Sequence, residues 1–96
     1  MNYKIIMHSE VIKRDLQKIP SNLLESIINS IEKRIAVRPY DFKPLSGKMF
    51  RGIYRLRVGD YRIAYCIEED NKTATIFCID VRGKIYDKLQ NRIKKQ

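Results

Sequence analysis

Three arginines are crowded into the segment YRLRVGDYRIAY, which covers residues 54–65. A Gly-Asp pair in its middle suits the two-residue loop of a β-hairpin, with glycine first as a type II′ turn prefers. That loop fixes the register of the two strands, so that Arg57 lies directly opposite Arg62. Because side chains alternate between the faces of a strand, Arg55 lies on the same face. The sequence therefore predicts a patch of guanidinium groups on one face of a hairpin.

Two cations directly opposite each other destabilise a sheet by about 0.2–1 kcal/mol, so this pairing needs an explanation. A bound phosphate would supply one, because arginine binds phosphate in a bidentate geometry and stays charged when partly desolvated. The alternative is that a neighbouring carboxylate neutralises the arginines. Asp80 is the candidate, since alternation along the expected strand 73–81 puts it on the side opposite Phe77. If the Phe77 face is the core, Arg82 lies with Asp80 on the arginine side.

Tyr86 follows Arg82 by four residues, a spacing at which one turn of helix would bring the two side chains together. The tyrosine ring could stack on an unpaired RNA base, or it could pack on the sheet as an ordinary helix residue. Several arginines with a tyrosine suit a metal-free phosphoryl transfer, in which guanidinium groups stabilise the charge that builds on the phosphate.

Metal ligands are scarce in this chain. One histidine and two cysteines are too few for the four N or S ligands of a structural zinc site. Cys66 and Cys78 lie in apolar runs, and we expect them to be buried as small apolar side chains. We expect neither a metal nor another cofactor.

The hydrophobic pattern predicts a scaffold for these residues in the order β-α-α-β-β-β-α. The expected strands cover residues 3–8, 53–58, 61–67 and 73–81, and the expected helices cover residues 9–19, 21–37 and 84–96. The segment between the second helix and the next strand holds two prolines and two glycines, so we expect a surface loop there. The pattern indicates an α+β fold with one domain, residues 1–96. A small antiparallel sheet carries a helical hairpin on one face and is followed by a C-terminal helix.

Serines are expected to cap the first two helices at their N-termini, Ser9 for the first and Ser21 for the second. Apolar side chains recur at helical spacing in both. They are Val11, Ile12, Leu16 and Ile19 in the first helix, and Leu23, Leu24, Ile27, Ile28, Ile31 and Ile35 in the second. The C-terminal helix has a shorter stripe of Ile85, Leu89 and Ile93. Each stripe predicts a buried helix face.

Composition narrows the class of protein. The chain has 96 residues, of which 44% are hydrophobic, which is enough for one domain with its own core. Its 20 Lys and Arg outnumber 11 Asp and Glu, and the net charge of +9 favours a polyanionic partner such as nucleic acid. No apolar run approaches the ~20 residues of a membrane-spanning helix. We therefore expect a soluble cytoplasmic protein with no membrane partner.

The segments PLSGKMFRGIYRLRVGDYRIAYCIEED and FCIDVRGKIYDKLQNR resemble the RelE/ParE superfamily of toxins from type II toxin–antitoxin systems. The resemblance covers the whole chain. It implies a small twisted antiparallel sheet with helices on one face and a concave basic face opposite. In the RelE-like branch the toxin cuts mRNA in the ribosomal A site without a metal. The 2′-OH attacks the neighbouring phosphate, and the products carry a 2′,3′-cyclic phosphate and a 5′-OH.

The resemblance also implies roles for individual residues. Arg62 and Arg82 match phosphate-stabilising arginines, and Tyr86 matches a tyrosine implicated in catalysis and base stacking. Arg55 and Arg57 fall where RelE-type enzymes have lysines, and we expect both to bind phosphate. The other residues expected to bind phosphate are Lys48, Arg51 and Lys84. The general base stays open between Lys84 and the Tyr86 hydroxyl.

Two other functions remain open at this stage: a ParE-like poison of DNA gyrase without nuclease chemistry, and a catalytically weakened relative that only binds RNA. The resemblance implies two partners. One is mRNA on the ribosome, with contacts to 16S rRNA, and the other is an acidic antitoxin that folds on binding and forms a higher-order complex. Ile85, Leu89 and Ile93 are candidate antitoxin contacts; the alternative is that they pack in the domain's own core.

Overall fold

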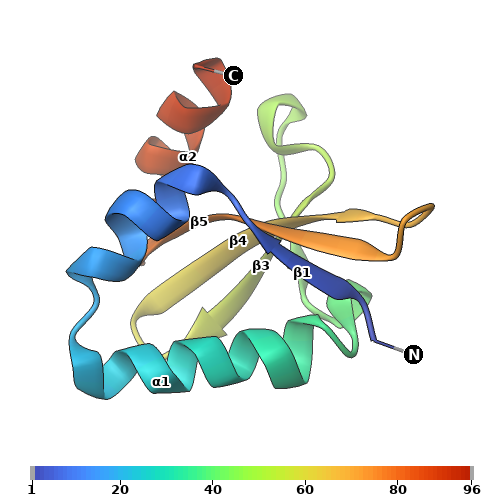
Figure 1. Ribbon diagram of the computed structural model, residues 1–96. Coiled ribbons are helices and arrows are strands. Elements are labelled where there is room, and N and C mark those ends of the chain that lie inside the picture. The colour runs from blue at the N-terminus through green and yellow to red at the C-terminus, as the bar shows by residue number, and fades with distance from the viewer. Residues whose placement is uncertain (1, 96) are drawn as a thin grey trace.

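The computed structural model describes residues 2–95, so Met1 and Gln96 of the expected 1–96 domain lie outside the described part. The described strands form one sheet in the order β1-β5-β4-β3-β2. They are β1 Lys4–Met7, β2 Lys43–Pro44, β3 Ile53–Val58, β4 Tyr61–Glu68 and β5 Thr73–Val81. The helical segments are η1 Val11–Asp15, η2 Leu16–Lys18, α1 Ser21–Ser30, η3 Ile31–Ile35, η4 Pro39–Asp41, η5 Lys48–Phe50 and α2 Ile85–Lys94. Figure 1 shows α1 and α2 on opposite sides of the sheet.

The sheet is mostly antiparallel, as the α+β prediction requires, except at β1. This strand lies at one edge and pairs in parallel with β5, with Lys4 opposite Thr73 and Met7 opposite Ile76. The predicted antiparallel sheet is therefore confirmed for the pairs that join β2, β3, β4 and β5, and the pair of β1 with β5 departs from it. The helices after β1 carry the chain over one face to β2 at the far edge, and the meander β3-β4-β5 then brings it back beside β1. A parallel pair requires a long crossover of this kind. The short strand β2 lies within the segment expected to be a loop.

The β3–β4 hairpin has the register that the sequence predicts. Val58 lies opposite Tyr61, and Arg57 lies opposite Arg62. The φ angle of Gly59 is +59°, in the left-handed region that the first loop position of a type II′ turn needs. The local sequence alone therefore determined which side chains share a face of this hairpin.

The pairing of β4 with β5 contains a bulge at Phe77. The residues on either side of it, Ile76 and Cys78, pair with consecutive residues of β4. An extra residue of this kind reverses the alternation along a strand. Phe77 therefore packs with Cys78 in the apolar cluster beneath α2, and the use of Phe77 to mark the face opposite the arginines is wrong. Asp80 still lies on the arginine face, because it pairs directly with Arg62.

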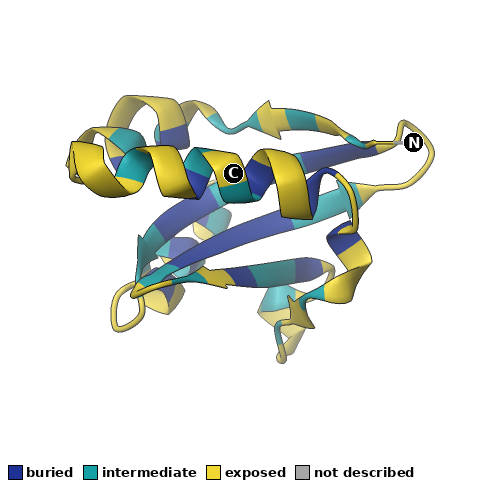
Figure 2. Cartoon of the chain, turned by 90° about the horizontal axis from the view of Figure 1, so that it is seen from below, coloured by how far each residue is buried: buried dark blue, intermediate teal, exposed yellow. Residues whose placement is uncertain are grey.

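The sheet buries apolar side chains on both of its faces. Figure 2 shows the buried residues along its strands. The larger cluster lies between the sheet and the segment from η1 to η3. Its buried members are Val11, Ile19, Ile27, Ile31, Ile35, Leu56, Ile63, Tyr65, Ala74, Ile76 and Ile79. The second cluster is covered by α2 and contains Ile53, Ala64, Cys78, Ile85 and Leu89. The arginine face of the sheet is thus partly occupied by a small core of its own.

The helices begin differently from the prediction. Ser9 is already helical, and the Glu10 N–H donates a hydrogen bond to Nδ1 of His8 at 3.1 Å. Ser21 is the first residue of α1, and Pro20, which precedes it, has no side-chain cap. Both expected serine N-caps are therefore wrong. Among residues 2–95, no helix is long and apolar enough to cross a membrane.

The first helix buries a carboxylate at a position where an apolar residue would be usual. η1 is a π-helical turn that ends with a hydrogen bond from the Leu16 N–H to the Val11 carbonyl. In this wider turn Ile12 is 52% exposed, whereas Asp15 is only 1% exposed. The expected burial of Ile12 is wrong, and Asp15 lies on the inward face between Val11 and Ile19.

The packing of α2 gives a direct test of the second core. Leu89 is fully buried, so Leu89→Ala should lower the free energy of unfolding by about 2–5 kcal/mol through lost contacts and a cavity. Urea titration followed by circular dichroism measures this change. The exposed neighbour Asn91→Ala is the control and should alter stability by less than about 0.5 kcal/mol. An unchanged midpoint for Leu89→Ala would mean that α2 does not pack on the sheet in solution.

Candidate phosphate-binding site

Four arginines approach one another on the face of the sheet that carries α2. Arg57 is exposed, Arg55 is half-buried and Arg62 is only 6% exposed. Burial lowers the pKa of Arg62, and the positive charges of Arg57, Arg55 and Arg82 lower it further. The structure therefore brings together four guanidinium groups that the sequence placed on two separate segments.

Arg62 is held against the hairpin turn. Its Nη1 donates hydrogen bonds to the carbonyls of Gly59 at 3.0 Å and Tyr61 at 3.1 Å. Its buried Nε has no hydrogen-bond partner among the described residues, and the same is true of the Nε of Arg55. Unpaired buried donors are costly and are uncommon in folded proteins. The two unpaired donors, on Arg55 and Arg62, therefore lower the stability of the folded protein on this face of the sheet.

Neutralisation by a local carboxylate does not explain the cluster. Asp80 forms an ion pair with Lys88 of α2 at 2.9 Å, and its other oxygen accepts the Val81 N–H at 2.7 Å. Within residues 2–95, no carboxylate lies within ion-pair distance of the four guanidinium groups. The charge of Asp60 raises the pKa of Arg62, but its effect is smaller than that of each of the three arginines.

Tyr86 joins the cluster through Arg55. The Arg55 Nη1 donates a hydrogen bond of 2.9 Å to the Tyr86 hydroxyl. The tyrosine is 39% exposed, and its ring lies 6.1 Å from that of Phe50, tilted by 53°. The expected neighbour was Arg82, but no hydrogen bond joins Tyr86 to Arg82 in the described part of the chain. Arg82 instead lies in the exposed turn before α2, where its backbone N–H donates a hydrogen bond to the Asp60 carbonyl at 2.9 Å.

Three other expected phosphate ligands lie close in the chain to Phe50 or to Tyr86. Lys48 and Arg51 are exposed on either side of Phe50, in the turn that places this ring against Tyr86. Lys84 is exposed immediately before α2. No hydrogen bond or ion pair fixes these three side chains to any residue in the range 2–95. Sequence reasoning missed Phe50; its position between two cations in a glycine-bounded loop was the available signal.

The thiols have no geometry for metal binding. Cys78 is buried, which raises the pKa of its thiol to about 12, and Cys66 is half-buried. In the part of the chain that the structure describes, no group of three His, Cys, Asp or Glu side chains could hold a metal ion.

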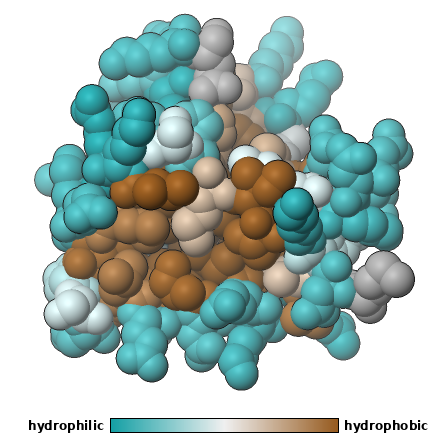
Figure 3. All heavy atoms as spheres, viewed as in Figure 1, coloured by the Kyte–Doolittle hydropathy of each residue, from teal (hydrophilic) through white to brown (hydrophobic). Residues whose placement is uncertain are grey.

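The three apolar side chains expected to contact an antitoxin pack against this domain. Ile85 is 1% exposed and Leu89 is fully buried, while Ile93 packs at the margin of the same cluster. The alternative, that they belong to the domain's own core, is the one that the structure shows. Figure 3 shows a separate apolar area on the side of the molecule that carries η1 and α1. Ile12 of η1 and Leu23 of α1 are among the large apolar side chains that stay exposed, at 52% and 41%.

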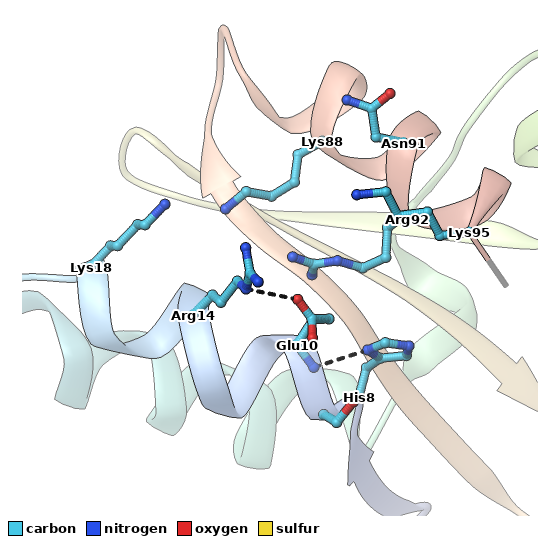
Figure 4. Close-up of a pocket in the computed structure, with 9 residues that line it drawn as sticks. His8, Glu10, Arg14, Lys18, Lys88, Asn91, Arg92 and Lys95 are labelled. Carbon is cyan, nitrogen blue, oxygen red and sulfur yellow. Dashed lines mark hydrogen bonds and ion pairs between the residues drawn. The ribbon is translucent and has the colours of Figure 1, made fainter.

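A cavity of about 660 Å³ lies between η1 and α2, away from the guanidinium cluster. Figure 4 shows Lys88 and Arg92 reaching into this region from α2, opposite Glu10 and Arg14. The guanidinium cluster does not line this cavity, and two of its arginines, Arg57 and Arg82, are exposed on the surface. It is therefore suited to a polymer backbone that crosses the surface.

Known proteins resemble this chain over most of its length. Residues 6–86 match the family described as the ParE toxin of the type II toxin–antitoxin system parDE. Toxin RelG of Mycobacterium tuberculosis is 31% identical over 75 residues, which cover 77% of this chain and 85% of that protein.

Solved structures show the same fold. The toxin–antitoxin complex RelBE2 of M. tuberculosis has a TM-score of 0.78 and 26% identity, covering 85% of this chain and 93% of that chain. The archaeal RelE–RelB complex of Pyrococcus horikoshii has a TM-score of 0.62 and 27% identity, and the match covers 88% of this chain and 99% of that chain. A variant of Escherichia coli toxin RelE in the free state has a TM-score of 0.68, and the match covers 99% of this chain and 97% of that chain. At 12% identity it supports the fold alone.

The facing arginines make a measurable prediction. Arg57→Gln should raise the free energy of unfolding by about 0.2–1 kcal/mol, because it removes the like charge opposite Arg62. The gain should shrink in 1 M salt, where the screening length falls to about 3 Å. Urea unfolding at low and high salt measures both effects. The control Lys33→Gln removes an equal charge from η3; an equal gain there would assign the effect to net charge rather than to the pair.

Proposed function

The chain belongs to the RelE/ParE superfamily of toxins of type II toxin–antitoxin systems, and we propose that it is a ribosome-dependent mRNA endonuclease of the RelE kind. The observation that carries this proposal is the set of four guanidinium groups with no carboxylate partner in residues 2–95, joined to Tyr86 through Arg55. A phosphodiester is the ligand that such a set would bind, since each guanidinium can donate two parallel hydrogen bonds to phosphate oxygens.

In the proposed reaction, the 2′-oxygen of the mRNA attacks the adjacent phosphorus and the 5′-oxygen of the next nucleotide leaves. The 2′-OH gives up its proton and the leaving oxygen takes one, so the products are a 2′,3′-cyclic phosphate and a 5′-OH. Arg57 and Arg82 have exposed side chains that can contact the phosphate directly. Arg62 is buried and contributes its charge. Together they stabilise the negative charge that increases in the transition state.

Tyr86 has two proposed tasks. Its oxygen accepts a hydrogen bond from Arg55, so its own O–H hydrogen can still be donated to the phosphate or to the leaving oxygen. Its exposed ring, next to Phe50, offers a surface on which an unpaired base can stack. The proton acceptor for the 2′-OH is proposed to be either Lys84 or this hydroxyl, because the arginines stay protonated.

A gyrase poison without nuclease chemistry is the second candidate. The family match over residues 6–86 is to ParE toxins, and this favours that candidate. In this case the arginines would contact a protein or DNA surface without any bond cleavage. The two candidates differ in the damage that they cause, because an RNase cuts translated mRNA and a gyrase poison provokes a DNA damage response.

An antitoxin partner is part of the proposal. The structural relatives from M. tuberculosis and P. horikoshii are toxin–antitoxin complexes. We propose that the partner of this chain covers the apolar area on the side of η1 and α1, the elements that carry the exposed Ile12 and Leu23, rather than the buried stripe of α2. The charge of +9 would speed the encounter with an acidic partner in the cytoplasm.

Arg82→Ala tests the site directly. We expect codon-phased cuts in a translated reporter mRNA when the wild type is induced in bacteria. On programmed ribosomes, cleavage by Arg82→Ala should be about 100-fold slower or worse, because one phosphate donor is lost. Primer extension locates the cuts. Arg38→Ala removes an exposed arginine that is ion-paired with Asp41 and does not belong to the cluster, and this variant should cut normally.

Other results of the same experiment would reject the RNase proposal. Growth arrest without cuts, together with a DNA damage response, would identify a gyrase poison. RNA binding by a folded protein that causes neither arrest nor cuts would identify a relative that only binds.

Tyr86 substitutions separate its two tasks. Tyr86→Phe should keep RNA affinity but slow cleavage, because it keeps the ring and removes the hydroxyl. Tyr86→Ala should also lose about 1–3 kcal/mol of RNA binding through lost stacking. Single-turnover cleavage and fluorescence anisotropy measure the two quantities. Tyr40→Phe, which removes an exposed hydroxyl bonded to Glu69, is the control. Equal cleavage rates for Tyr86→Phe and wild type would exclude a role for the hydroxyl.

A further inference from the structure

Asp80 and Arg62 lie directly opposite each other on neighbouring strands. Side chains in such a position have Cβ atoms about 4.5–5.5 Å apart, within reach of a hydrogen-bonded ion pair. An arginine and a carboxylate at this spacing normally pair in a bidentate geometry. The register of the sheet therefore favours an Asp80–Arg62 ion pair.

The two residues do not pair in the structure. Asp80 Oδ2 accepts a hydrogen bond from Lys88 Nζ at 2.9 Å, and Asp80 Oδ1 accepts the Val81 N–H. Arg62 points to the carbonyls of the hairpin turn, and its buried Nε has no partner among residues 2–95. A carboxylate and an unsatisfied guanidinium N–H thus occupy paired positions on one face without neutralising each other.

Lys88 is fixed in the position from which it holds Asp80. Its ammonium group also donates to Asp15 Oδ1 at 3.0 Å. Asp15 is fully buried and accepts the Ile79 N–H at 2.8 Å and both terminal nitrogens of Arg92 at 2.9 and 3.1 Å. Burial lowers the pKa of Lys88, but the hydrogen bonds to Asp80 and Asp15 outweigh it and raise the pKa above its ordinary value. Lys88 therefore stays charged between two carboxylates.

We propose that Lys88 is a positioning residue of the phosphate site. From α2 it holds the carboxylate of Asp80 and so keeps Asp80 from pairing with Arg62. The ligand that benefits is an RNA phosphodiester, so this inference rests on the proposed function for the identity of the ligand. Lys88 acts through Asp80 and does not itself contact the RNA. Its place on α2, bonded to the buried Asp15, is what separates the acidic side chain from the four arginines.

The consequence for binding is electrostatic. Without Lys88, the Asp80 side chain is expected to turn to Arg62 and to supply the acceptor that Nε lacks. One negative charge would then lie inside the guanidinium cluster, and an incoming phosphate would have to displace it. Affinity for RNA depends strongly on each phosphate contact, and the loss of one contact lowers it by about three- to tenfold at moderate salt.

The test compares four full-length variants with the wild type. Lys88→Met removes the ammonium group but leaves Asp15 paired with Arg92 and with the Ile79 N–H. Lys94→Met is the matched control, since it removes an exposed lysine from the same helix. Asp80→Asn removes the competing charge, and the fourth variant combines Lys88→Met with Asp80→Asn. The probe is a fluorescent single-stranded RNA of mixed sequence, and anisotropy gives its dissociation constant.

We expect Lys88→Met to weaken RNA binding about three- to tenfold and Lys94→Met to weaken it less than about twofold. The double variant should recover to within about twofold of Lys94→Met, because the neutral amide that replaces the Asp80 carboxylate cannot compensate the charge of Arg62. A second measurement does not need RNA. The Arg62 Nε–H resonance in NMR spectra should shift and exchange more slowly in Lys88→Met, and should return in the double variant.

Several outcomes would overturn the inference. Unchanged RNA affinity in Lys88→Met would show that Asp80 does not move. A loss that Asp80→Asn fails to restore would show that Lys88 supports α2 rather than controls Asp80. If Lys88→Met does not fold, Lys88→Gln removes the charge and keeps a polar side chain that is one atom shorter, and the same comparison with Asp80→Asn applies. If the wild-type protein binds no RNA, the proposed function fails. The shift of the Arg62 Nε–H resonance in Lys88→Met still decides whether Lys88 keeps Asp80 from pairing with Arg62.

Discussion

The buried carboxylate of Asp15 is the interaction on which the arrangement of the whole arginine face depends. It joins three elements that are distant in sequence: η1, the end of β5 beyond its pairing with β1, and α2. Burial raises the pKa of Asp15, but hydrogen bonds from Arg92, the Ile79 N–H and Lys88 outweigh it and hold the pKa below its usual range. Apolar contacts of Leu89 keep α2 on the sheet but have no direction. The charged hydrogen bonds are directional, and they fix where along the sheet this helix lies.

The hairpin next to this ion-pair network differs from it in how its charges are paired. The network contains two carboxylates for two cations, whereas the neighbouring strands carry arginines without any carboxylate partner in the described residues. Both carboxylates of this region are thus paired with Lys88 and Arg92, and the four arginines of the cluster lie apart from them. This separation costs stability, because Arg57 faces Arg62 and two buried Nε–H groups lack acceptors. Folding alone does not require this arrangement, whereas the proposed binding of a polyanion does.

Much of the fold and of the candidate site could be predicted from local sequence. The Gly-Asp loop set the register that pairs Arg57 with Arg62, because a two-residue turn leaves no freedom in strand alignment. Other parts could not be predicted. The bulge at Phe77 depends on how β5 packs against two different cores, and the parallel pairing of β1 depends on the path of the helices. The buried Asp15 has no local signature, since its partners are more than 60 residues away.

The sequence by itself determined the α+β class, the order of the elements, the hairpin register and the identity of the arginines and the tyrosine that meet on one face. These follow from short-range rules, namely the alternation of side chains, turn chemistry and helical spacing. Only the tertiary structure decided that Tyr86 contacts Arg55, that Asp80 bonds to Lys88 rather than to Arg62, and that the apolar stripe of α2 is buried. Each of these choices is a competition between partners from distant segments. Its outcome depends on distances of a few ångströms that exist only once the chain has folded.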